Sequence, residues 1–126
     1  MVSIRGESSP KIMKNDLIRI LKTVLKQIGE ENGIDFSNKK VAYFGCGDQH
    51  VYSGTFLDAL GTLEEKITAK GGSTIGLWPV DGYSFDYSKA QKDDKFVGLG
   101  IDNDNEPELT EERVEAWCKQ IESEFA

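Results

Sequence analysis

The part of the sequence best suited to ligand binding is a glycine-punctuated loop that follows a short apolar run. The run ends at Cys46, the loop begins Gly47-Asp48-Gln49, and an aromatic residue follows at Tyr52. Glycine tolerates positive φ and lets backbone N–H and C=O groups approach a flat ligand closely. An aromatic side chain at the far end of the loop can lie against that ligand. Taken alone, the pattern predicts a strand-to-helix turn in an α/β protein, with ligand binding as the sharper hypothesis.

Other residues in this region suggest weaker chemical alternatives. Cys46 would lie near a helix start, which lowers the pKa of a thiol, but no second cysteine is close and His50 is the only histidine in the chain. A reactive thiol is therefore the remoter hypothesis, and His50 is expected to face solvent. Asp102 and Asp104 belong to an acidic turn, for which a solvated surface is favoured over a weak cation site.

The charge of the chain is negative and unevenly distributed. Fifteen basic and 22 acidic residues give a formal net charge of −7 over 126 residues, a length that fits a single domain. Residues 1–40 hold eight basic and five acidic residues, a net of +3, whereas residues 41–126 hold seven and seventeen, a net of −10. Such an acidic surface repels nucleic acid and anionic membranes and suits partners with basic surfaces.

The two cysteines and the start of the chain indicate a cytoplasmic protein. Cys46 and Cys118 lie far apart, without a CxxC pair or a cysteine-histidine spacing suited to zinc. Residues 1–10 lack the apolar core of a signal peptide, and no apolar run approaches the length of a membrane span. We therefore expect neither export nor membrane insertion.

Residues 10–28 predict a basic amphipathic helix. Leu17, Leu21, Val24 and Ile28 recur at helical spacing, and glycines follow from residue 29. Basic amphipathic helices can bind membranes or partner proteins, but a packed apolar stripe with a solvated basic face is the favoured interpretation.

Beyond residue 40 the apolar pattern alternates between strands and helices. Strands are expected at residues 41–44, 74–78 and 95–101, helices at about 56–70 and 110–125, and an aperiodic aromatic loop at 81–94. This order requires crossover connections, which make the strands parallel and place helices on the faces of the sheet. The loop is too long for a simple connection and is typical of a functional or inserted segment.

The two expected helices have candidate caps and apolar stripes. Ser53 or Thr55 is expected to cap the first helix, and Thr110 the second. The stripes expected to be buried are Phe56, Ala59, Leu60, Leu63 and Ile67 in the first helix, and Val114, Trp117, Cys118, Ile121 and Phe125 in the second.

A series of specific motifs runs through residues 35–126. It comprises Asp35-Phe36-Ser37, Lys39 to Gly45, Gly47-Asp48-Gln49, Tyr52, Asp58-Ala59-Leu60-Gly61, Trp78-Pro79, Asp81-Gly82-Tyr83, Phe85, Ser88-Lys89-Ala90, Lys95 to Leu99, Ile101-Asp102, Asp104, Leu109-Thr110, Glu112-Arg113-Val114 and Trp117. This series resembles the C-terminal half of a long-chain flavodoxin. The aperiodic stretch at 81–94 resembles the insertion that splits the last strand of the long-chain members.

The resemblance implies a doubly wound parallel sheet of the flavodoxin type that binds flavin mononucleotide (FMN) and carries single electrons, rather than an enzyme. Backbone groups of Cys46, Gly47, Asp48 and Gln49 would face the pyrimidine edge of the flavin ring, and Tyr52 would stack on its outer face. The resemblance places Asp104 near the ribityl chain. A reduced flavin carries negative charge, so an acidic site lowers the potential at which it forms.

The resemblance does not extend to residues 1–34, which are interpreted as a separate tail and basic helix. Flavodoxins begin with a strand and a phosphate-binding loop, and no such motif appears in residues 1–40. The resemblance therefore implies a partial fold with weakened FMN binding. The strand at Val41 would become an exposed edge that invites a homo-oligomer or a partner strand. The alternative function is a non-redox remnant that acts as an association module.

Overall fold

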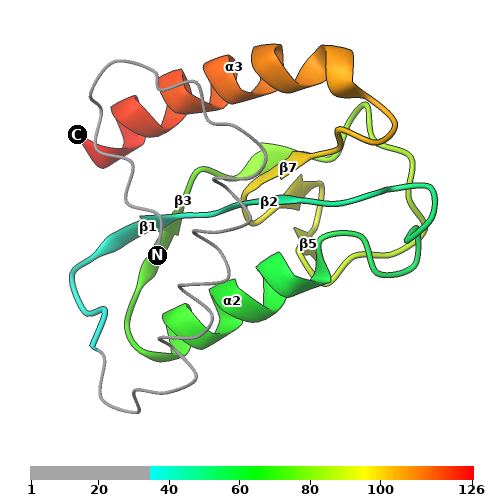
Figure 1. Ribbon diagram of the computed structural model, residues 1–126. Helices are drawn as coiled ribbons and strands as arrows, with labels where there is room; N and C mark the ends of the chain where they lie inside the picture. Colours follow the sequence, from blue (N-terminus) through cyan, green and yellow to red (C-terminus); the bar gives the residue numbers. More distant parts are fainter. Residues whose placement is uncertain (1–34) are drawn as a thin grey trace.

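The computed structural model describes residues 35–126, so the helix expected at residues 10–28 lies outside the described residues. The strand β1 (Lys40–Ala42) and the strand β2 (Phe44–Cys46) follow one another with only Tyr43 between them. β1 pairs in parallel with β3 (Ser73–Ile75), and β2 pairs in parallel with β7 (Leu99–Ile101). The parallel sheet predicted from the sequence is confirmed (Figure 1).

β3 and β7 lie along the same edge of the β1–β2 run. The N–H of Ser73 donates to the C=O of Lys39, and the N–H of Leu99 donates to the C=O of Tyr43, both at 2.9 Å. Lys39 and Tyr43 are four residues apart, and alternate residues of a strand direct their backbone groups to the same side. The opposite edge, at Lys40, Ala42 and Phe44, pairs with no strand from residues 35–126.

Helices cover both faces of this sheet. The helix α2 (Asp58–Ala69) and the helix α3 (Pro107–Phe125) lie on opposite sides of the strands (Figure 1). Val41 and Tyr43 pack in a cluster with the apolar face of α2, whereas Ala42 and Phe44 pack with that of α3. All four residues are buried, as expected for a strand that is apolar on both faces.

Both helix starts differ from the predictions. α2 is preceded by Leu57, which has a φ of 60° and provides no side-chain cap, while Ser53 donates its hydroxyl to Asp86 instead. α3 has Pro107 at its first position, where the fixed φ of proline suits a helix start. Thr110 therefore lies inside α3, where its hydroxyl donates to the side chain of Asn103.

The apolar stripes are largely as predicted. Ala59 is exposed rather than buried, and Phe125 is only partly buried. The other residues expected to face the core are buried: Phe56, Leu60, Leu63 and Ile67 near α2, and Val114, Trp117, Cys118 and Ile121 in α3.

Two predicted strands are interrupted at glycines. The strand expected at residues 74–78 stops at β3 because Gly76 has a φ of 76°, and its C=O accepts the indole N–H of Trp117. The strand expected at residues 95–101 divides at Gly98, where a Cβ would lie 2.1 Å from the C=O oxygen of Tyr43. Both interruptions depend on contacts with distant residues, which local sequence patterns do not reveal.

The aromatic loop expected at residues 81–94 is partly ordered into a small antiparallel sheet. The strand β6 (Lys95–Phe96) pairs with both β4 (Trp78–Pro79) and β5 (Gln91–Lys92). Tyr83 and Phe85 pack against the α2-side core through the rings of Phe56 and Phe96. The segment is thus a packed insertion between the two halves of the sheet edge. No helix among residues 35–126 is long and apolar enough to cross a membrane.

Candidate functional site

The loop after β2 is shaped by the carboxylate of Asp48. The Oδ1 atom of this carboxylate accepts the backbone N–H groups of Val51 at 2.9 Å and His50 at 3.1 Å. The backbone C=O of Asp48 accepts the N–H of Tyr52. The hydrogen bond from Val51, followed by that from Asn105, holds the pKa of Asp48 below its ordinary value. Asp48 is therefore a charged group that fixes the course of the loop.

The aromatic residue at the end of the loop faces outward. The side chain of Tyr52 is 62% exposed and that of its neighbour Val51 is 71% exposed. Large apolar side chains with this exposure lie on a surface that a flat ligand can cover. His50 is also exposed, as predicted.

The backbone donors expected to face a ligand are unequally available. The N–H of Gly47 donates to the C=O of Ile101 at 2.9 Å, and the N–H of Gln49 donates to Oδ2 of Asp102 at 3.1 Å. Between them, the N–H of Asp48 has no acceptor among residues 35–126. Of these three N–H groups, it is the one that the described residues leave for a ligand. Cys46, the last residue of β2, is half-buried and forms no disulfide.

Gly47 is required for packing as well as for access. A Cβ at this position would lie 2.9 Å from Cε1 of Phe56 and 3.4 Å from Cδ2 of Leu57. Both residues belong to the segment that leads from the loop into α2. The loop therefore approaches the start of α2 as closely as a backbone without a side chain permits.

Asp102 lies at the centre of the site and is completely buried. Its carboxylate accepts the N–H of Gln49, the N–H of Asn105 at 3.0 Å and the side-chain amide of Asn105 at 2.9 Å. Burial opposes ionisation, but the hydrogen bonds from Asn105 and Gln49 outweigh it and hold the pKa of Asp102 below its ordinary value. The prediction of a solvated turn is wrong for Asp102, because these donors replace water.

Asn105 connects the acidic turn to the loop after β2, and sequence reasoning missed it. Its Nδ2 donates to Oδ1 of Asp48 at 2.7 Å, and its Oδ1 lies 2.9 Å from Nδ1 of His50. The sequence places this residue in an acidic turn after an expected strand, but only the structure shows that this strand, β7, pairs with β2. The carboxyl ends of neighbouring parallel strands meet at one edge of a sheet, where ligands bind.

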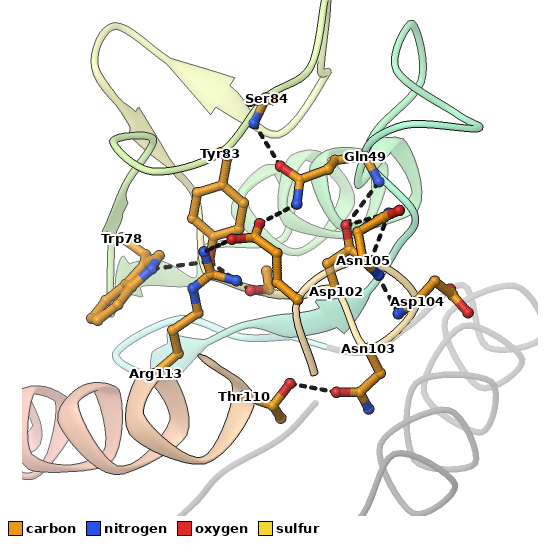
Figure 2. Close-up of polar contacts among 12 residues, drawn as sticks. Gln49, Trp78, Tyr83, Ser84, Asp102, Asn103, Asp104, Asn105, Thr110 and Arg113 are labelled. Atoms are coloured by element: carbon orange, nitrogen blue, oxygen red, sulfur yellow. Dashed lines mark hydrogen bonds and ion pairs between the residues drawn. The ribbon is translucent and has the colours of Figure 1, made fainter. Parts of the chain in front are cut away.

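Some of the predicted site residues contact the acidic turn through their side chains, and others do not. Gln49 is buried, and Asp48 contacts the turn through Asn105. Asp104 is exposed, and its side chain points away from the Asp102–Asn105 contact (Figure 2). Its N–H donates to Oδ1 of Asp102 at 3.2 Å, so Asp104 helps to form the turn through its backbone. No group of three potential metal ligands occurs within the described part of the chain.

Comparison with known proteins identifies relatives for most of the chain. A family model described as Flavodoxin matches residues 6–117. A flavodoxin from Synechocystis is 61% identical over 88 residues, which are 70% of this chain and 52% of the relative. Flavodoxin 1 from Escherichia coli K12 is 55% identical over 93 residues, 73% of this chain and 53% of the relative. This chain thus spans about half the length of the curated relatives it matches.

The fold is also similar to solved structures of flavodoxins. The crystal structure of a Fusobacterium nucleatum flavodoxin bound to flavin mononucleotide superposes with a TM-score of 0.70 at 27% identity. The superposition covers 94% of this chain and 66% of that one. The resemblance inferred from the sequence motifs is confirmed by the family match and by these relatives. This chain belongs to the flavodoxin family.

Proposed function

We propose that this protein binds FMN at the loop of residues 46–52 and carries single electrons between partner proteins. The observation that carries the proposal is the exposed phenol ring of Tyr52 at the end of a loop fixed by Asp48. The loop lies at the carboxyl end of parallel strands, where open α/β sheets bind their ligands. The family and the FMN-bound relative support the same ligand.

The described residues fit the flavin ring of FMN. In this proposal the exposed ring of Tyr52 would stack on the flavin, and the N–H of Asp48 would donate to it. Gly47 has no Cβ, which lets the backbone of the loop pack against the ring of Phe56. Cys46 and Gln49 contribute backbone to the same loop, and Asp104 extends the acidic turn toward the ribityl chain.

Bound FMN supplies the ring that takes up and releases single electrons, and no side chain need act as an acid or nucleophile. The residues of the chain instead bind and orient the ring and set the charge around it. Asp48 and Asp102 both have lowered pKa values and are ionised at neutral pH. Two nearby carboxylates disfavour additional negative charge on a bound flavin and so lower its potential.

The charge distribution suggests the partners. Residues 41–126 carry a net charge of −10, which suits redox proteins with basic surfaces and disfavours nucleic acid and anionic membranes. Electron transfer to such partners should slow as salt is added, because screening weakens their attraction. A cytoplasmic location is consistent with this composition.

The sheet edge suggests a second association. The edge at Lys40, Ala42 and Phe44 pairs with no strand from residues 35–126, and an unpaired edge is a template for another strand. We therefore propose that this edge can pair with a strand of a second copy of the chain, as an addition to FMN binding. Light scattering that shows a strict monomer at high concentration would count against it.

Titration of FMN fluorescence tests the proposed function. The wild-type chain should quench FMN fluorescence saturably, and Tyr52→Ala should weaken binding about tenfold because stacking is lost. Tyr52→Phe keeps the ring and should bind almost as well as the wild type. Tyr87→Ala is the matched control, since Tyr87 is 61% exposed and Tyr52 62%. Equal binding by Tyr52→Ala and the wild type would remove Tyr52 from the site, and the absence of any saturable quenching would reject FMN.

A further inference from the structure

Arg113 is a buried cation outside the ligand loop. It lies on α3, and its side chain is only 10% exposed. Its Nη2 lies 3.3 Å from Oε2 of Glu106, and its Cζ lies 4.1 Å from the centroid of the Tyr83 ring. Its Nη1 is buried without a hydrogen-bond partner among residues 35–126. Burying a charge is costly unless other groups compensate it, so this placement requires an explanation.

The partners of Arg113 lead directly to the ligand loop. The second carboxylate oxygen of Glu106 accepts the side-chain amide of Gln49. The amide oxygen of Gln49 in turn accepts the backbone N–H of Ser84 at 2.6 Å. Ser84 follows Tyr83, whose ring lies against Arg113, so the contacts form a closed circuit (Figure 2). The circuit joins α3, the insertion at 81–94 and the ligand loop.

Tyr83 is itself fixed in place. Its hydroxyl donates to the C=O of Gly100 in β7 at 2.7 Å and accepts the indole N–H of Trp78 at 3.2 Å. Burial raises the pKa of Tyr83 to about 12, so its hydroxyl stays neutral at physiological pH. The ring therefore presents a fixed face to the guanidinium of Arg113, the geometry in which a cation is attracted to an aromatic ring.

Gln49 is the point at which the circuit can influence ligand binding. Gln49 is 1% exposed, and its side-chain amide is held at both ends, by Glu106 and by Ser84. Its backbone N–H is held by Asp102. The residue before it is Asp48, whose N–H has no acceptor among residues 35–126. Because Gln49 directly follows Asp48, a displacement of the Gln49 backbone shifts the segment that carries that N–H.

We propose that Arg113 is a positioning residue for the FMN loop, which it orients through Glu106 and Gln49. This inference rests on the proposed function and names a residue about 60 positions away in the sequence from the loop it controls. The planar guanidinium suits this role because it can stack on Tyr83 and donate to Glu106 at once. A lysine at the same position would keep the charge but not both contacts.

The test compares Arg113→Lys with a matched core variant in the full chain. Ile121→Val is the control, because Ile121 is buried on the same helix and belongs to the α3-side core cluster rather than to the circuit. Each variant is characterised by its melting temperature, its FMN dissociation constant and its NMR spectrum without FMN. The NMR probes are the side-chain amide of Gln49 and the backbone N–H of Asp48.

Arg113→Lys should move the side-chain amide signals of Gln49 and speed hydrogen exchange at Asp48, and it should weaken FMN binding roughly tenfold. Ile121→Val should lower the melting temperature without either effect. Glu106→Gln should weaken binding as well, and its combination with Arg113→Lys should add little, because both changes open the same circuit.

Two results would overturn the inference. One is an Arg113→Lys variant that melts earlier but keeps the Gln49 and Asp48 signals of the wild type. The other is full additivity of the Arg113 and Glu106 variants in FMN binding. If the wild type itself binds no FMN, the proposed function fails, while the NMR signals of the FMN-free protein still decide whether Arg113 positions the loop.

Discussion

Two buried carboxylates in this protein are stabilised in different ways. Asp102, at the candidate site, is 0% exposed, and amide groups of Gln49, Asp104 and Asn105 donate to it. Glu64, on α2, is 3% exposed, and its carboxylate pairs with Lys92 at 2.9 Å and accepts the hydroxyl of Thr74. The charge of Glu64 is balanced by a cation, whereas that of Asp102 is held by neutral donors.

The difference agrees with the role proposed for each region. Glu64 joins α2 to the insertion through Lys92, so pairing its charge serves the fold alone. Asp102 holds the loop after β2. In the proposed function, a cation beside Asp102 would cancel the negative potential that disfavours extra electrons on a bound flavin. Amide donors stabilise the carboxylate and leave its charge in place. The comparison therefore links the hydrogen bonds of Asp102 to the proposed redox role.

The largest expected effect is that of Asp102→Ala. The substitution leaves the buried N–H groups of Gln49 and Asn105 without their acceptor, which should lower the free energy of unfolding by about 3 kcal/mol. Urea unfolding measures this loss. Asp81→Ala removes an exposed carboxylate from the insertion and should change stability by less than about 0.5 kcal/mol. Equal losses of unfolding free energy in the two variants would show that the hydrogen bonds to Asp102 do not stabilise the fold.

The next largest effect is a pH dependence of stability that arises from Asp48 and Asp102. The pKa values of Asp48 and Asp102 are lowered in the folded chain, relative to about 3.9 for an unfolded aspartate. Folding therefore favours the ionised forms, and their contribution to stability is present above about pH 4 and is lost as the pH falls through the folded pKa values.

Asp102→Asn should flatten this dependence, because the variant has one carboxylate fewer to protonate. Thermal unfolding between about pH 5 and pH 2 measures the change, and the stability of the wild type should fall more steeply than that of the variant. Parallel curves for the two proteins would mean that Asp102 titrates alike in the folded and unfolded chains.

The sequence predicts the frame of the fold better than the contacts of the site. The continuous apolar run at residues 41–44 indicates a strand buried on both faces, and all four residues are buried in the structure. Such a run is visible in the local sequence. The interruptions at Gly76 and Gly98 depend on Trp117 and the backbone of Tyr43, which are distant in the sequence. Local patterns cannot reveal such contacts.

The site shows the same limit. The sequence indicates the glycine loop and Tyr52, because their types and order are distinctive. It does not indicate that Asp102 is buried, because a turn with several acidic residues is ordinarily solvated. The groups that replace water around Asp102 include the N–H of Gln49, which lies in another strand–loop unit. Arg113 likewise reads as one more charged residue of a helix until its contacts with Tyr83 and Glu106 are known.

The smallest expected effect separates the two carboxylates by their response to salt. Glu64→Gln keeps the shape of the side chain and loses the ion pair with Lys92, which should cost about 1 kcal/mol at low ionic strength. Lys92 is 63% exposed, so salt screens the pair, and the difference from the wild type should shrink as salt is added. The difference between Asp102→Asn and the wild type should stay constant in the same salt series, because its partners carry no charge. A salt response of equal size at both positions would show that both carboxylates depend on cations, and the contrast between the two regions would be lost.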